Sequence, residues 1–243
     1  MSEQKLKRQI RILAVCLTLI TLLFGGLFTW LYCQSQQMTK EELTLKKLNL
    51  IGEDGTLRMV LSNEHRQNPG VIDGKPLSPR QRPAGIIFFD NNGNECGGLT
   101  YNQEDKEGRI NKEMSFTMDN YRNDQVLQLI DDESYKDGKA QIRRGMAINE
   151  FPVGATLADL IKSADSIKAT GDSTQRAKAL AALFDQKSYK RRLFVGRTNE
   201  DQSGLFLFDH QGRPRMQIFV DSLGNPQILA LDTAGNKKSL VRL

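Results

Sequence analysis

One long apolar run stands apart from the rest of the hydrophobic pattern. Residues 12–32 contain no charged side chain. A helix of this length, at ~1.5 Å per residue, matches the roughly 30 Å hydrocarbon core of a bilayer. Trp30 and Tyr32 close the run, where aromatic rings favour the headgroup layer. The pattern therefore predicts a transmembrane helix over residues 12–32.

Beyond residue 42 the pattern changes to short apolar stretches separated by Asp, Asn and Gly. Such stretches, alternating or continuous in apolar character, are typical of β-strands joined by tight turns. The predicted strands are residues 43–51, 56–62, 85–90, 98–101, 216–220, 227–231 and 239–243.

Three turns near the C-terminus, at residues 209–212, 221–224 and 232–235, share an Asp-x-x-Gly motif. An Asp in the first turn position accepts hydrogen bonds from backbone N–H groups two or three residues on, and Gly adopts a positive φ at low steric cost. Regular short strands with these turns predict a mainly β fold. We expect an antiparallel meander closed as a barrel, a sandwich or a propeller-like sheet.

Residues 156–187 break this β pattern. Apolar side chains recur there at helical spacing in two segments, which predicts a helical hairpin inserted between two stretches of sheet. Thr156 is the expected N-cap of the first helix, and Ser173 or Thr174 is that of the second. The apolar stripe of the hairpin is expected to pack on the sheet, and partner binding is the alternative.

The flanks of the apolar run predict its orientation. Residues 1–11 carry four basic side chains against Glu3, whereas residues 33–42 are polar and nearly balanced. Basic flanks stay on the cytoplasmic side. We therefore expect a single-pass cell-membrane protein with a cytoplasmic tail (1–11), a stalk (33–42) and an extracytoplasmic domain (43–243). A cleaved signal peptide is the alternative, but it would have a shorter apolar region and a small-x-small cleavage site.

Small side chains recur at every fourth position of the predicted membrane helix, at Thr21, Gly25 and Thr29. Such a stripe lets two membrane helices approach closely. It is the candidate surface for a homodimer, although small residues are also common in membrane helices that do not associate.

Charge and cysteine content narrow the function classes. The net charge is +5, and residues 1–33 account for +3 of it, which leaves +2 for the rest of the chain. A domain so near neutrality has no broad cationic surface for a phosphate backbone, so nucleic acid is not an expected partner. Cys96 is the only cysteine after residue 33, so no internal disulfide is expected in the domain. We expect Cys96 to be a small buried apolar residue rather than a nucleophile.

The remaining polar motifs predict no catalytic residue, cofactor or metal site. Asp90 to Glu95 resembles a calcium loop in its alternating oxygen side chains, but its Gly is at the fourth position and the same turn frame recurs without the ligands. His65 and His210 are the only histidines, so a His/Cys zinc site is not expected. Acidic residues 131–133 are the candidates for a paired-carboxylate hydrolase. Residues 63–84, which contain four prolines and several basic side chains, predict a long irregular loop and a first candidate partner site.

Several segments form a recognisable combination. They are residues 48–63, 84–99, 114–116, 124–129 and 212–216. Together they resemble a family of uncharacterised bacterial proteins with an N-terminal membrane anchor and Asp-x-x-Gly hairpin repeats. The resemblance covers most of residues 43–243 and implies that residues 95–98 and 124–125 belong to a recurrent design. It implies no activity, so no residue inherits a role from it.

The sequence therefore predicts a membrane-anchored, non-catalytic module for interaction or envelope organisation. An envelope hydrolase with scattered carboxylates and a small-ligand sensor are the alternatives. An enzyme needs a cleft of convergent polar groups with shifted pKa values, whereas an interaction module needs an exposed apolar or aromatic patch. Convergence of Glu95, Asp124 or His65 in one pocket would favour the enzyme.

Overall fold

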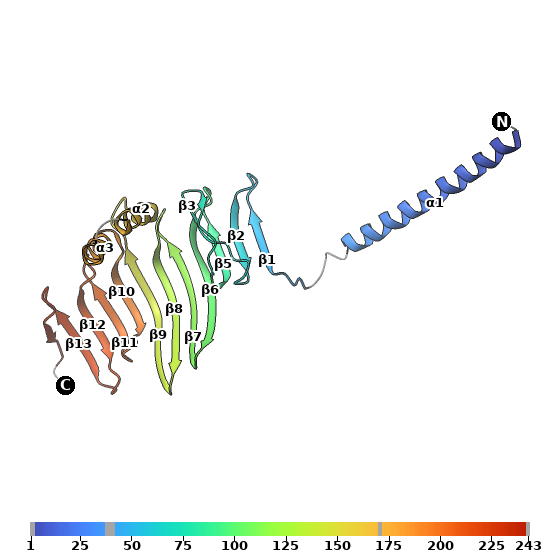
Figure 1. Ribbon diagram of the computed structural model, residues 1–243. Helices are drawn as coiled ribbons and strands as arrows, with labels where there is room; N and C mark the ends of the chain where they lie inside the picture. Colours follow the sequence, from blue (N-terminus) through green and yellow to red (C-terminus); the bar gives the residue numbers. More distant parts are fainter. Residues whose placement is uncertain (1–2, 37–41, 170–171, 242–243) are drawn as a thin grey trace. The chain divides into compact units, whose positions relative to one another are not determined.

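The computed structural model describes residues 3–36, 42–169 and 172–241 (Figure 1). The chain divides into two compact units, one up to Leu45 and one from Lys46 to Leu243. The first unit contains helix α1 (Glu3–Gln36), and the second contains every described strand and the two other helices. Half of the predicted stalk, residues 37–41, lies outside the described residues.

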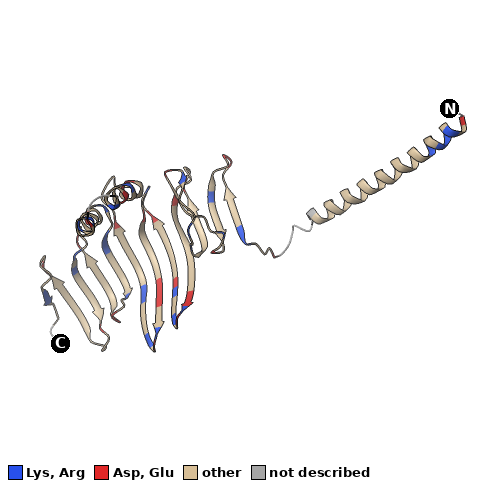
Figure 2. Ribbon diagram, viewed as in Figure 1, with Lys and Arg blue, Asp and Glu red and all other residues tan. Residues whose placement is uncertain are grey.

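Helix α1 is the one described helix that is long and apolar enough to cross a membrane, and a signal sequence near the N-terminus has the same properties. It contains the whole predicted span, residues 12–32, so the helical prediction is confirmed. Basic side chains gather at its N-terminal end (Figure 2). The hydroxyl of Thr21 donates to the carbonyl of Leu17, and that of Thr29 to Gly25, within the same helix. Orientation and helix pairing stay predictions.

The second unit is built on one open, twelve-stranded antiparallel sheet in the order β1-β2-β5-β6-β7-β8-β9-β10-β11-β12-β13-β14. Every neighbouring pair is antiparallel, which confirms the predicted meander. The strands are β1 (Lys47–Ile51), β2 (Leu57–Ser62), β5 (Ala84–Phe89), β6 (Glu95–Lys106), β7 (Arg109–Asp119), β8 (Gln125–Lys136), β9 (Lys139–Glu150), β10 (Lys190–Arg197), β11 (Ser203–Phe208), β12 (Pro214–Val220), β13 (Pro226–Leu231) and β14 (Lys237–Ser239).

The predicted closure of this meander is wrong. Strands β1 and β14 form opposite edges of the described sheet and do not pair with each other, so there is no barrel or propeller. No second large sheet packs on the first among the described residues, so the chain alone does not form a sandwich either. Both edge strands are short and carry lysines, at Lys47, Lys237 and Lys238. Short, Lys-bearing edges disfavour pairing with another strand, so the residues at both edges suit an open sheet.

The predicted Asp-x-x-Gly turns are confirmed. In the turn after Asp90, its backbone N–H donates to the carbonyl of Asn94, and the N–H of Gly93 donates back to the carbonyl of Asp90. The Asp90 carboxylate accepts from the N–H groups of Asn92 and Asn94 and from the Asn94 amide. The carboxylates of Asp221 and Asp232 are bonded in the same way. The oxygens that resembled calcium ligands therefore serve the turn.

A phenylalanine core lies on one face of the sheet, which we call the aromatic face. Phe194, Phe206 and Phe219 are buried, with ring centroids 6.0 and 5.7 Å apart along the series. In the backbone beneath them Gly145 pairs with Gly196, which pairs in turn with Gly204. A Cβ at Gly196 would lie 2.0 Å from the Arg144 carbonyl oxygen, so glycine is required there.

Residues 63–84, which we call the strap, pack on the same aromatic face. The prediction of an irregular loop is wrong in part, because the strap contains a small hairpin of β3 (Val71–Ile72) and β4 (Lys75–Pro76). Val71 packs against the buried side chains of Val60, Ile87 and Phe89. The four prolines limit the regular structure to these two short strands, but the strap still covers part of the core.

The predicted helical hairpin is confirmed as α2 (Leu157–Lys168) and α3 (Ser173–Lys187), at the end of the sheet where β9 ends and β10 begins (Figure 1). Thr156 is the N-cap of α2, as predicted, and its hydroxyl accepts from the N–H of Asp159. The N-cap of α3 is Asp172 rather than Ser173 or Thr174, because its carboxylate accepts from the N–H groups of Thr174 and Gln175. Helix α2 buries Ala164 against the sheet end.

Candidate functional site: an acidic pocket beside the strap

A cavity of about 450 Å³ opens between the strap, the β7–β8 turn and the first turns of α2. This volume falls within the range of small-molecule sites. Four carboxylates and three guanidinium groups line it: Asp73, Glu95, Asp119, Asp124, Arg80, Arg82 and Arg122. Leu157 and Ile161 of α2 supply the apolar wall.

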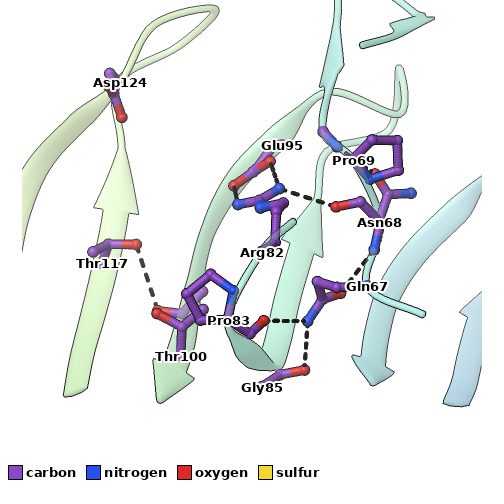
Figure 3. A network of polar contacts seen from close by, with 12 residues as sticks. Gln67, Asn68, Pro69, Arg82, Pro83, Gly85, Glu95, Thr100, Thr117 and Asp124 are labelled. Atoms are coloured by element: carbon purple, nitrogen blue, oxygen red, sulfur yellow. Dashed lines mark hydrogen bonds and ion pairs between the residues drawn. The ribbon is translucent and has the colours of Figure 1, made fainter. Parts of the chain in front are cut away.

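The strap is held over the sheet at both ends. At its tip, the Arg122 guanidinium donates to the Asp73 carboxylate at 2.7 Å, and the N–H of Gly74 donates to the Asn94 side chain at 3.1 Å. At its base, the Gln67 amide donates to the carbonyl of Gly85 at 3.1 Å (Figure 3). The first contact holds the Asp73 carboxyl pKa below its ordinary value. These tethers fix the pocket wall.

The start of α2 is fixed to the opposite wall. The buried Asn123 amide donates to the carbonyl of Ala155 at 2.9 Å, and the N–H of Leu157 donates to the carbonyl of Arg122 at 3.0 Å. Because the same β7–β8 turn contacts both the strap and α2, three segments that are distant in the sequence form one cavity.

Arg82 and Glu95 form the central ion pair of the pocket (Figure 3). The guanidinium donates two hydrogen bonds of 2.7 Å to the two Glu95 oxygens, and one of 3.3 Å to the carbonyl of Asn68. Their side chains are only 13 and 22 % exposed. The hydrogen bonds that Arg82 donates to Glu95 raise the pKa of Arg82, and bidentate geometry of this kind is both strong and directional. The pair locks the strap to strand β6.

Asp119, at the end of β7, is the most perturbed acid of the pocket. Burial raises the pKa of its carboxyl to about 7, assisted by the charges of Asp124 and Glu95 and opposed by Arg82. Its Oδ1 atom is buried and has no hydrogen-bond partner among residues 3–36, 42–169 and 172–241. Asp124 accepts only from the N–H of Gln125 in the bonds described, and it stands apart from the strap network (Figure 3). These two carboxylates have no ion-pair partner within the described chain, whereas Asp73 and Glu95 each have an arginine.

The structure brings together only some of the predicted candidates. Glu95 and Asp124 both line this pocket, and such a convergence is what the enzyme alternative requires. His65 does not: its ring is exposed and contacts the neighbouring Glu64. His210 lies in the turn after Asp209, far along the chain from the pocket walls. No signal in the sequence marked Asp119.

Acidic residues 131–133 do not form a catalytic carboxylate pair. Asp131 and Glu133 are each bonded to both Lys112 and Arg144, at 2.7 to 2.9 Å. Lys112 is the largest contributor to the low pKa of Glu133, which is about 2. Asp132 points to the opposite face, where it pairs with Arg143. Each carboxylate is therefore committed to a structural ion pair.

Cys96 is exposed at the irregular start of β6, so the prediction of a buried apolar residue is wrong. A register shift between β5 and β6 at this point turns the side chain out of the sheet core. Desolvation, followed by the charges of Asp119, Asp90 and Glu95, raises the pKa of the thiol. The raised pKa disfavours the thiolate, which is the reactive form.

Comparisons with protein-family models, curated proteins and solved structures find no match to this chain. The resemblance predicted from the sequence thus gains no support from them. The fold and the pocket define a class of architecture instead: an apolar helix of membrane-spanning length and an open antiparallel sheet with a strapped acidic cavity.

The raised pKa of Asp119 predicts a pH-dependent stability. A native pKa of about 7, above the ordinary 3.8, means that the folded state keeps a proton which the unfolded state releases. This stabilisation is complete below about pH 4 and is lost as the pH rises to 7. The side chain of Asp119→Asn does not titrate. Between pH 4 and pH 8, the free energy of unfolding of the wild type should therefore fall by about 2 kcal/mol more than that of the variant, a value that allows for the partial exposure of the carboxyl. Urea unfolding followed by circular dichroism measures this difference, and parallel pH profiles would contradict it.

Proposed function

We propose that this protein is a single-pass, membrane-anchored binding module. Its extracytoplasmic domain captures a small polar ligand that carries an amine. The observation that carries the proposal is the cavity whose two unpaired carboxylates, Asp119 and Asp124, lie beside an apolar wall. These two carboxylates offer hydrogen-bond acceptors and negative charge, whereas Arg82 and Arg122 are paired with Glu95 and Asp73, and the Arg80 guanidinium donates to the carbonyl of Pro69.

The anchor and its orientation belong to the same proposal. The four basic side chains before the apolar run support a cytoplasmic N-terminus. The pocket would then face the extracytoplasmic space, with the strap (63–84) and α2 as its ligand-contacting elements. Alkaline extraction of membranes, together with added protease on intact cells, tests this arrangement. Retention in the pellet and cleavage of the β unit support it.

A second candidate is an envelope hydrolase, because one observation favours it. A carboxyl with a pKa of about 7 can donate a proton at neutral pH, and Asp124 would then be the ionised partner. In this candidate Asp119 is the general acid and Asp124 activates water. Turnover of a glycan or polymer fragment, abolished by Asp119→Asn, would decide for the enzyme.

Thermal unfolding of the full-length protein in detergent tests ligand capture with simple probes. Glucosamine and putrescine carry amines, and glucose is the neutral control. We expect both amines to raise the midpoint, and Asp124→Asn to weaken their binding about tenfold, the equivalent of ~1.4 kcal/mol. Asp185→Asn is the matched control, because this carboxylate on α3 is 81 % exposed and does not line the cavity. The absence of a midpoint shift with either amine, or equal shifts in Asp124→Asn, would contradict the proposal.

A further inference from the structure

The face of the sheet opposite the aromatic face carries two continuous rows of apolar side chains. The register places one row from Leu48 on β1 to Ile228 on β13, through Leu129 and Val195. Every position in this row is Leu, Ile, Val, Met or Phe. We call this surface the aliphatic face.

The adjacent row has the same character. It runs from Leu50 on β1 to Ala230 on β13, through Met118 and Ile148. Gly97 and Ala230 are its only residues smaller than Leu, and none of its positions is polar. Rows aligned across so many strands are adjacent in space, because paired residues on neighbouring strands point to the same face.

Within the second unit, no described segment covers the aliphatic face. Apart from Gly97, no residue of either row is buried, and Met118 and Leu129 are each 48 % exposed. The strap packs on the aromatic face, and the helical hairpin lies at one end of the sheet. By contrast Ala147 and Phe194, which point to the aromatic face, are buried. The second unit therefore buries apolar side chains on the aromatic face and leaves the aliphatic face exposed.

The size of the aliphatic face matches a subunit interface. The eleven strands from β1 to β13, spaced ~4.8 Å apart, give a length of ~50 Å, and two rows of alternate residues give a width of ~14 Å. The product is a footprint of ~700 Å². A stable dimer buries ~800 Å² on each partner, whereas the largest apolar patch of an ordinary monomer is ~300–600 Å².

We infer that the aliphatic face is the interface with a second copy of this chain. A sheet that is apolar on one face packs against another layer, and two such sheets stack ~10 Å apart with their strands ~30° from parallel. A two-fold axis between identical faces makes the contact self-complementary. The sandwich that one chain does not form is completed by two.

The charges around the aliphatic face fit a second copy better than a lipid surface. Beside the rows, Lys112 and Arg144 form ion pairs with Asp131 and Glu133 of the same chain. Between β1 and β13, two copies can therefore meet without an unpaired charge in the contact, and Lys238, which continues the second row on edge strand β14, lies at its rim. A segment that lies on a membrane carries free Lys or Arg and Trp near its apolar surface. Neither row contains these residues between β1 and β13, and Trp30 belongs to α1.

Cross-linking of the full-length protein in its membrane tests the inference. Cys16, Cys33 and Cys96 are first replaced by Ser, and a single cysteine is then added on strand β8. Leu129→Cys lies at the centre of the aliphatic face, and Gln128→Cys, the next residue, is its matched control on the aromatic face. With a short bis-maleimide linker we expect a dimer band at least tenfold stronger for Leu129→Cys than for Gln128→Cys. Equal bands, or none for Leu129→Cys, would overturn the inference.

The oligomeric state in detergent gives a second, independent readout. Light scattering should give two chains per particle for wild type and one for the double variant Leu129→Lys, Val195→Lys. Both positions are solvent-exposed in the single chain, so the variant should keep its circular dichroism spectrum. Gly25→Leu, on α1, should remain dimeric, which separates this interface from the helix stripe. A monomeric wild type, or a Leu129 probe quenched by brominated acyl chains, would show that the face has another occupant.

Discussion

Glu95→Gln is expected to lower the free energy of unfolding of the β unit by about 3 kcal/mol. The substitution leaves the Arg82 guanidinium nearly buried, with a neutral amide in place of its bidentate carboxylate. Removal of one partner from a buried ion pair costs about 3–5 kcal/mol, and the lower end applies because both side chains keep some exposure. Urea unfolding at pH 7, followed by circular dichroism, measures the change.

Two controls separate this effect from a general loss of surface charge. Asp165→Asn breaks the exposed pair with Lys168 and should cost less than about 1 kcal/mol. The double variant Arg82→Met, Glu95→Leu removes both charges and should recover part of the loss, because apolar replacement of a buried pair is often neutral. If Glu95→Gln and Asp165→Asn behaved alike, the pair would not be holding the strap.

The turns could be predicted from sequence because their chemistry is local. In the turn at residues 221–224, Asp221 supplies the acceptor and Gly224 the positive φ of 87°, and both are visible in four residues of sequence. The same holds for Thr156, whose side chain caps α2 three residues away. Each of these structures depends on contacts within one turn of chain.

The long central strands were harder to predict because their outer halves are polar on both faces. On β7 and β8, Asn111 bonds to Ser134 on one face and Lys112 to Glu133 on the other. Without apolar alternation there is no strand signal, although Asp137-Gly138 is a typical two-residue hairpin turn, with φ of 50° and 71°. Strands β7, β8 and β9 were therefore absent from the prediction.

The pocket could not be predicted, because its chemistry arises from long-range packing. Asp119 is an ordinary acid in the sequence, and its pKa rises only because the strap and β6 bury it beside Asp124. In the sequence, Glu95 and Asp124 stand out through a resemblance and not through any pattern that reveals a cavity. The prediction of a closed sheet is wrong for a related reason. Strand patterns determine which side chains share a face, but they do not determine whether the last strand pairs with the first.

Phe206→Ala is expected to destabilise the β unit by about 3–5 kcal/mol, the cost of deleting a buried aromatic ring. Phe206 is 5 % exposed and contacts the rings of both Phe194 and Phe219, so its removal opens a cavity in the middle of the series. The glycines beneath the rings have no side chains that could fill the space. Urea unfolding of the variant at a fixed protein concentration measures the loss.

Leu223→Ala is the matched control, because this side chain is 85 % exposed in a turn and its loss should change stability by less than about 0.5 kcal/mol. Phe206 also points away from the aliphatic face, so the variant should keep the wild-type oligomeric state while it remains folded. A small effect would mean that the aromatic face is not the core of the unit. The sheet would then derive its stability from contacts on its other side. In that case the free energy of unfolding should depend on protein concentration far more steeply than it would if the aromatic core were the main source of stability.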